Sequence, residues 1–167
     1  MKIFIQTNEK LIHTALLIVR LTLGIFIFTH GAQKVLGIFG GHGLVPTVAM
    51  LAKGTGIPEW LLYLSAFVEF LGGIGMVLGL LTRFWGTALT INMVVATIEL
   101  APHGWFAPMG IELPATFALL ALAITIAGPG RFSVDYLLFA SPSPAPNPSE
   151  EQPFNVPGGS AQFRPGI

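Results

Sequence analysis

Long apolar runs dominate the sequence, and apolar residues do not alternate with polar ones. Stretches such as LLIVRLTLGIFIF and ATFALLALAITIA therefore predict α-helices and argue against the alternating strands of a β-barrel. About 20 mostly apolar residues cross a bilayer as one helix, so we expect four membrane-spanning helices. Their predicted ranges are Leu11–Leu36, Trp60–Leu81, Phe84–Leu100 and Glu112–Ala127.

Glycine and proline mark the connections between these spans. The very short turn Leu81–Arg83 makes the second and third spans antiparallel neighbours. Within the longest connection, Leu44–Lys53 predicts a short amphipathic helix at the membrane surface. The first span is longer than a signal-peptide core, contains Arg20 and is followed by no A-x-A site. We therefore expect a helix that is retained.

The chain changes character after the fourth span. Pro129 cannot continue a helix, and Ser133 is placed to cap a short segment that runs to Phe139, with Asp135 near its start. From residue 141 the sequence is rich in Pro, Ser, Gly and Asn, which cannot bury a core. We predict an all-α, antiparallel four-helix transmembrane domain over residues 1–139 and a disordered tail over residues 140–167.

Composition agrees with a lipid environment. Of the 167 residues, 53% are hydrophobic and only 10% are charged, whereas about a quarter are charged in soluble domains. The formal net charge is zero, so nucleic acid is a poor candidate partner. No cysteine is present, which excludes disulfides and thiol chemistry by this chain alone. We also expect no metal site.

Basic residues near the predicted spans set the orientation. Lys and Arg are more frequent on the side that carries both termini, which predicts that both termini are cytoplasmic. The four basic residues on this side are Lys2, Lys10, Arg83 and Arg131, and the two on the other side are Lys34 and Lys53.

Several ionisable residues lie within the spans, where an unpaired charge at the helix centre costs about 2.5–3.5 kcal/mol. At 100° per residue each span has one polar face, so the four faces can meet in a common interior. We expect Arg20 to pair with Glu69, and Lys34 to pair with Glu99 or Glu112. The candidate polar cluster consists of His30, Lys34, Glu69, Glu99 and Glu112, and Arg20 with Glu69 is the expected structural ion pair.

The buried ionisable residues could have a structural role or a functional one. Buried pairs can serve only to fix helix register, and this is an equal alternative for Arg20 and Glu69. The outer cluster is denser than packing requires, which favours a function there. Two histidines, His30 and His103, could also hold a haem, a less favoured alternative without further cofactor signals.

The same residues resemble a known family. The sequence contains Arg20, the motif HGxxK at His30–Lys34, ExxGG at Glu69–Gly73, GLLTR at Gly79–Arg83 and GPGRFSVD at Gly128–Asp135. This combination resembles the DoxX family of small bacterial membrane proteins over about residues 12–139. The resemblance implies a four-helix bundle in the bacterial cytoplasmic membrane. It also implies that Arg20, His30, Lys34, Glu69, Ser133 and Asp135 are family-pattern positions, none with an agreed catalytic role.

Some DoxX relatives are linked to sulfur or quinone redox chemistry, including a membrane subunit of thiosulfate:quinone oxidoreductase, and others to membrane oxidoreductase complexes in oxidative-stress defence. We therefore expect a redox-linked or accessory subunit that binds a quinone, with Lys34 or His30 donating to a carbonyl and Glu69, Glu99 or Glu112 relaying protons. The partners would be oxidoreductase subunits or further copies of the chain. A small transporter that uses the same polar residues, and a membrane anchor for a larger complex, are the alternatives.

Overall fold

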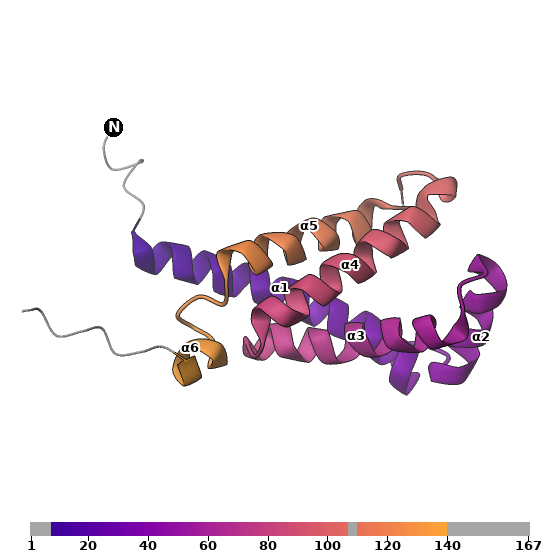
Figure 1. Ribbon diagram of the computed structural model, residues 1–167, viewed down its shortest axis with the longest axis horizontal. Coiled ribbons are helices and arrows are strands. Elements are labelled where there is room, and N and C mark those ends of the chain that lie inside the picture. The colour runs from indigo at the N-terminus through magenta and orange to yellow at the C-terminus, as the bar shows by residue number, and fades with distance from the viewer. Residues whose placement is uncertain (1–7, 107–109, 140–167) are drawn as a thin grey trace, which may run out of the picture.

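The computed structural model describes residues 8–106 and 110–139, and these residues are helical or lie in loops and turns (Figure 1). The predicted tail from residue 140, and with it the predicted domain boundary, lie outside the described residues. In chain order the helices are α1 (Glu9–Leu36), α2 (Leu44–Thr55), α3 (Glu59–Leu78), α4 (Thr82–Leu100), the 3-10 turn η2 (Ala101–His103), α5 (Glu112–Ala127) and α6 (Val134–Phe139).

Three described helices are long and apolar enough to cross a membrane: α1, α3, and α4 continued through η2 to His103. The predicted first, second and third spans correspond to them. The predicted fourth span is α5, which is apolar but has only 16 residues. At 1.5 Å per residue it is about 24 Å long, somewhat less than the ~30 Å of a bilayer core.

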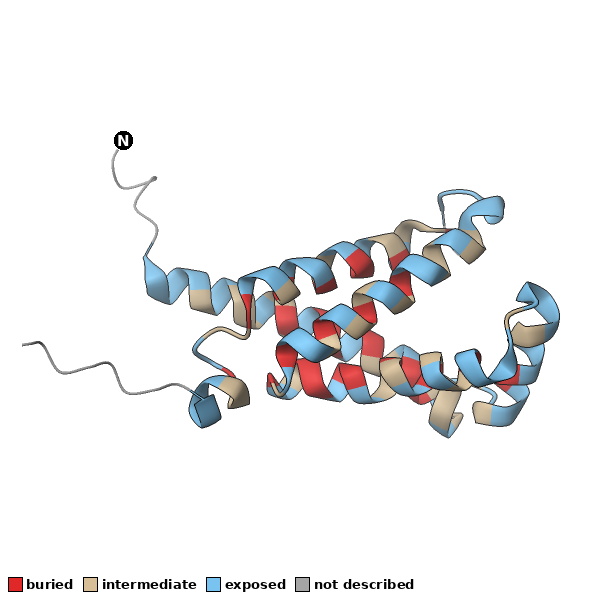
Figure 2. Cartoon of the chain, in the orientation of Figure 1, coloured by how far each residue is buried: buried red, intermediate tan, exposed pale blue. Residues whose placement is uncertain are grey.

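The long helices pack as two pairs, α1 with α3 and α4 with α5. The contact between α3 and α4 joins the two pairs. Figure 1 shows the pairs close together at the end where α6 lies and diverging toward the end where α2 lies. A buried apolar core occupies the crossing region, where red segments of all four helices meet (Figure 2). It consists of Leu23, Ile27, Met76, Leu89, Met93, Phe117, Ala118, Ala121 and Ile124.

Glycines set the distance and register between α1 and α3. Gly24 lies against Val77, and Gly31 lies against the backbone of Phe70, so the two helices run antiparallel. A Cβ on Gly31 would lie 2.5 Å from the Cα of Phe70, which leaves no room for any other residue. Small residues allow this approach, and it supplies the close van der Waals contact on which helix association in lipid depends.

The turn between α3 and α4 differs slightly from the prediction. Helix α3 ends at Leu78 because Gly79 adopts a left-handed conformation, and the N–H of Leu80 donates to the carbonyl of Gly75, as in a Schellman cap. The chain therefore reverses over Gly79–Leu81, and α4 begins at Thr82. The predicted short helices are confirmed: α2 forms over Leu44–Thr55, and α6 follows Ser133.

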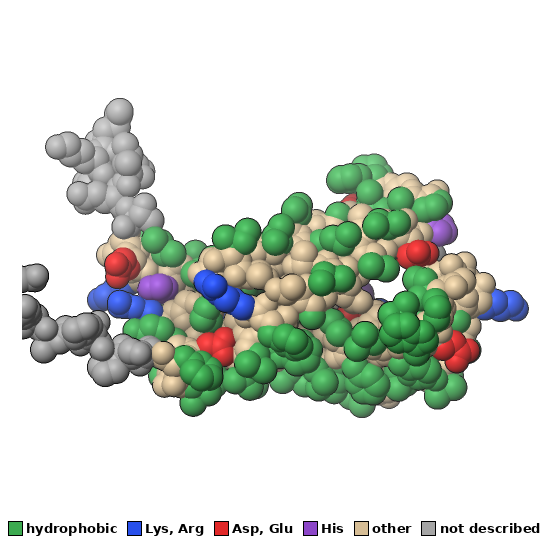
Figure 3. Space-filling view, in the orientation of Figure 1, with side chains coloured by type: hydrophobic (Ala, Val, Ile, Leu, Met, Phe, Trp, Pro, Cys, Tyr) green, Lys and Arg blue, Asp and Glu red, His purple; other side chains and the backbone are tan. Residues whose placement is uncertain are grey.

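The outward faces are apolar. Leu119 and Ile126 on α5 are 68% and 71% exposed, and Ile98 on α4 is 65% exposed. Hydrophobic side chains cover much of the visible face in Figure 3. Such large exposed apolar area is rare on water-soluble monomers, and here it offers a surface to lipid.

Candidate functional site

Arg20 is buried at the end of the bundle where α6 lies, and its contacts are with main-chain groups. Its side chain is only 2% exposed, and its two terminal nitrogens donate to the carbonyls of Pro129 and Phe132. The predicted ion pair between Arg20 and Glu69 therefore does not form. The guanidinium instead holds the segment after α5 against α1.

The register of α1 against α3 explains this difference. Since Gly24 lies beside Val77, Arg20 comes level with Gly79 at the end of α3, where a Cβ would lie 2.6 Å from its Nη1. Glu69 lies about ten residues back from that end, some 15 Å away along the helix axis at 1.5 Å per residue. Both residues do face the interior, as predicted, but at different depths.

Ser133 and Asp135 complete this end of the molecule. The hydroxyl of Ser133 accepts from the N–H of Tyr136, 3.1 Å away, so it caps α6 as predicted. The carboxylate of Asp135 accepts from the N–H groups of Leu81, at 2.7 Å, and Thr82, at 2.8 Å. Asp135 thus caps the start of α4, a helix distant in sequence, and its own N–H donates to the carbonyl of Gly79.

The candidate site lies further along the bundle, where Lys34 of α1 meets Glu69 of α3. The Lys34 Nζ is 2.6 Å from the Glu69 Oε1, and the two side chains are 27% and 3% exposed. Asn92 of α4 donates to the same oxygen at 3.1 Å. Lys34 therefore pairs with Glu69. The predicted pairing of Lys34 with Glu99 or Glu112 is wrong, because the α1–α3 register brings Glu69 level with Lys34.

The second carboxylate oxygen of Glu69 distinguishes this cluster from a simple structural pair. Oε2 is buried and has no hydrogen-bond partner among the residues that the structure describes. A buried acceptor without a donor is unfavourable by about 1–3 kcal/mol, and in native proteins such an atom calls for an explanation. A bound proton, a water molecule or a ligand donor would each satisfy it.

Aromatic side chains on α1, in the two turns before Lys34, contact α5. His30, one helical turn before Lys34, makes an edge contact with the ring of Phe117 on α5, with the centroids 6.4 Å apart. Phe26 lies 6.2 Å from the same ring. Phe117 is 8% exposed and belongs to the core. Helix α5 thus contacts α1 through Phe117 in the turns that precede Lys34.

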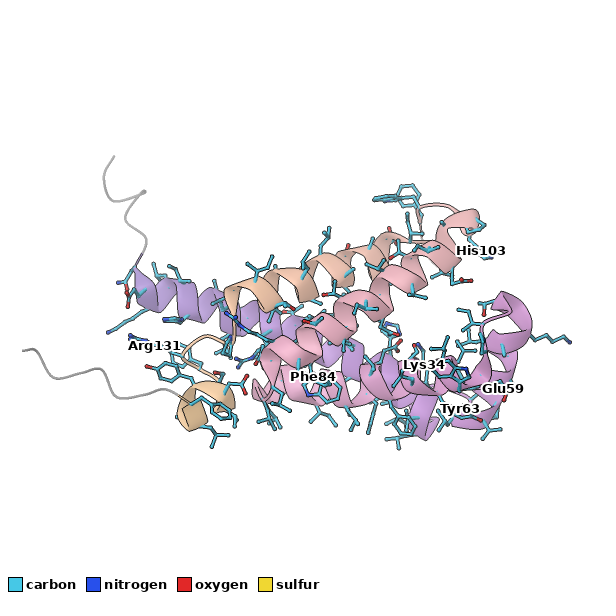
Figure 4. The ribbon with its side chains drawn as sticks, viewed as in Figure 1. Lys34, Glu59, Tyr63, Phe84, His103 and Arg131 are labelled. Carbon is cyan, nitrogen blue, oxygen red and sulfur yellow. The ribbon has the colours of Figure 1, made fainter. Side chains whose placement is uncertain are left out.

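The space-filling view shows a notch between the ends of α4 and α5 and the ends of α2 and α3 (Figure 3). Lys34 is seen on the α3 side of this notch, and His103 lies beyond the end of α4 (Figure 4). His30 and His103 are exposed, and Glu99 and Glu112 are half-buried near the same end. No contact between His30 and His103 is found among the described residues, so the haem alternative stays a prediction.

Asn92 is the residue that sequence reasoning undervalued. Its spacing from Glu99 puts the two residues on one face of α4. It is not among the predicted site residues. Its amide nevertheless links α4 to Glu69, so this uncharged side chain makes the site a three-helix arrangement.

Comparison with known proteins agrees with the resemblance seen in the sequence. The pattern of the DoxX family matches residues 15–104, a range that includes Lys34, Glu69 and Asn92. The chain is 33% identical over 138 residues to the "Inner membrane protein YqjF" of Escherichia coli (strain K12), an alignment that covers 78% of this chain and 96% of YqjF.

A second relative carries a name with functional content. The chain is 27% identical over 124 residues to the "Putative oxidoreductase CatD" of Bacillus subtilis (strain 168), covering 74% of this chain and 86% of CatD. No solved structure matches the chain.

Proposed function

This chain belongs to the DoxX family of integral membrane proteins, and from that premise we propose that it is a redox-linked subunit of a membrane oxidoreductase that binds a quinone beside Glu69. The name of CatD supports the redox class, and the polar cluster inside the bundle supports the place of binding. The observation that carries the proposal is the buried Oε2 of Glu69, which has no hydrogen-bond partner among the described residues and lies next to a half-buried lysine.

The chemistry of the cluster suits a quinone. A quinone presents carbonyl acceptors on a flat ring, and Lys34 and Asn92 are donors that can turn from Glu69 toward such an acceptor. The rings of Phe117 and His30 provide aromatic surface about one helical turn along α1 from Lys34.

Proton transfer gives Glu69 its role. Reduction of a quinone to a quinol takes up two electrons and two protons. The electrons would come from a partner oxidoreductase subunit, and Glu69 would pass protons from the notch to the reduced oxygen. Because a carboxylate that relays protons must lie within hydrogen-bond reach of the group it serves, the quinone carbonyl would sit beside Oε2.

We further propose four membrane crossings, with both termini in the cytoplasm of a bacterial cell. The name of YqjF supports an inner-membrane location. Basic residues near the ends of the spans support the orientation, because they are more frequent in the half that contains α6 than in the other half. Among the described residues they are Lys10, Arg83 and Arg131 in the first half, and Lys34 and Lys53 in the second.

Titration of the detergent-purified protein with a short-chain quinone analogue tests the proposal. We expect the analogue to raise the melting temperature, and Glu69→Gln and Lys34→Met to weaken its binding by about tenfold, the equivalent of ~1.4 kcal/mol for one charged hydrogen bond. Glu59→Gln is the matched control, because Glu59 is an exposed carboxylate at the start of the same helix (Figure 4). If the analogue changes neither the melting temperature nor the tryptophan fluorescence, the proposal fails.

Proton-coupled transport is a second candidate, and the same buried carboxylate favours it. An ionisable residue inside a span commonly marks a proton or ion path. Proteoliposomes would then show uptake that depends on a pH gradient and is lost with Glu69→Gln but kept with Glu59→Gln. Such uptake without any response to the quinone analogue would favour transport over quinone binding.

A further inference from the structure

An open groove lies at the opposite end of the bundle from the notch, between the start of α4 and α6. It encloses about 440 Å³ and is lined by Leu81, Thr82, Arg83, Phe84, Pro129, Asp135, Tyr136 and Phe139. Its walls are almost entirely apolar, apart from Arg83 and Asp135. The groove shares no residue with the cluster around Glu69, so it is a separate feature of the molecule.

Arg83 is the one basic side chain that lines the groove, and it is exposed. It forms no salt bridge within the part of the chain that the structure describes. A Cβ on Gly128 would lie 3.4 Å from its Nη2, which places the guanidinium over the end of α5. A charged group with five donors therefore stands at the edge of an apolar groove without a salt bridge to any described residue.

Asp135 is the acidic residue of the groove, and its carboxylate is already engaged. Both oxygens accept main-chain N–H groups at the start of α4, from Leu81 and Thr82. Asp135 therefore shapes the groove wall while Arg83 remains available. Two other basic residues of this half have partners: Arg20 donates to main-chain carbonyls, and Arg131 lies 3.7 Å from Glu9.

The geometry points to a binding site for an anionic phospholipid, with the phosphate on Arg83 and an acyl chain along Phe84 and Phe139. Charge complementarity supports this occupant, since this half of the described chain carries an excess of basic residues. An apolar wall next to a guanidinium also matches the two parts of a lipid, and basic pockets between spanning helices bind anionic headgroups in other membrane proteins. Tyr136, 40% exposed, adds the amphipathic ring that is typical of the membrane–water boundary.

Native mass spectrometry of the full chain, released from nanodiscs of equal parts phosphatidylcholine and phosphatidylglycerol, tests this site. We expect phosphatidylglycerol to be retained in preference to phosphatidylcholine, and Arg83→Gln to reduce that retention about five-fold, since one interfacial basic residue contributes ~1 kcal/mol toward anionic lipid. Arg83→Lys should keep part of the retention, because it keeps the charge but loses the planar fork. Lys53→Gln, at the other end of the molecule, is the control and should retain the lipid fully.

Three outcomes would overturn the site: equal retention by Arg83→Gln and the parent, equal loss with Lys53→Gln, or displacement of the lipid by millimolar inorganic phosphate, which would indicate a free-anion site. Both leaflets of a nanodisc contain the same lipids, so the result does not depend on orientation. It is also independent of quinone binding, because Arg83 does not touch that cluster. Arg83 is exposed, so its replacement should leave folding intact, and the melting temperature verifies this.

Discussion

Lys34 and Glu69 meet across the tightest part of the α1–α3 contact, with Nζ 2.6 Å from Oε1. The approach depends on Gly31, whose missing side chain lets the backbone of α3 come close just one turn before Lys34. The pair is therefore set by main-chain packing and not by chance contact of two long side chains. Its two members should consequently depend on each other.

A double-mutant cycle measures this dependence. Lys34→Met and Glu69→Gln should each lower the free energy of unfolding, because each leaves a buried polar partner without its counterpart. Together they should cost less than the sum of the two single changes, with a coupling of about 1–3 kcal/mol as found for residues in direct contact. Unfolding by sodium dodecyl sulfate in mixed micelles, followed by circular dichroism, gives the four free energies. Strict additivity would mean that the pair contributes nothing.

Arg20 should matter for stability more than any exposed basic residue. Arg20→Met leaves the carbonyls of Pro129 and Phe132 without their buried donor, so we expect a loss of about 2–4 kcal/mol in the free energy of unfolding. The lysine of Arg20→Lys can reach only one carbonyl at a time, so the free energy of unfolding of this variant should lie between those of the parent and Arg20→Met. Arg131→Gln is the control, since that guanidinium is exposed and its pair with Glu9 at 3.7 Å is weak. Equal melting temperatures for Arg20→Met and Arg131→Gln would contradict this role.

The positions of the helices were predictable from the sequence because the signal is local. The hydrophobic length that a span needs is a property of its own segment and does not depend on the other helices. This length alone therefore predicts α1, α3 and α4 to within a few residues. The cap of α6 by Ser133 was predictable for the same reason. The chain reversal was placed slightly late, since Gly79 ends α3 through a left-handed conformation that apolar length does not reveal.

The pairing of charges was not predictable, because it depends on the register between two helices. A sequence gives the depth of Arg20 and Glu69 only relative to the ends of their own helices. The register comes from where glycines such as Gly31 allow the backbones to meet. Main-chain acceptors add a second difficulty: every residue has a carbonyl, so nothing in the sequence marks those of Pro129 and Phe132 as the partners of Arg20.

Asp135 should be required for the start of α4. Its two oxygens satisfy the N–H groups of Leu81 and Thr82, and a lost cap of this kind typically costs about 1 kcal/mol, up to ~2. Asp135→Ala should therefore lower the free energy of unfolding by that amount, and Asp135→Asn by less, because one oxygen is kept. Amide hydrogen exchange should quicken at Leu81 and Thr82 in the alanine variant. Unchanged exchange there would show that the cap is dispensable.

A matched pair of glycine substitutions tests whether close packing of α1 on α3 holds the site. Gly31→Ala places a methyl group 2.5 Å from the Cα of Phe70, a backbone atom that cannot move without separating the helices. We expect a loss of more than about 2 kcal/mol in the free energy of unfolding, because overpacking costs ~1–3 kcal/mol and the Lys34–Glu69 pair would be strained as well. Gly54→Ala, in α2, meets nothing within 4 Å and should be neutral or stabilising by up to ~1 kcal/mol through helix propensity. If both variants unfold alike, the contact does not set the register, and the alignment of Lys34 with Glu69 must have another cause.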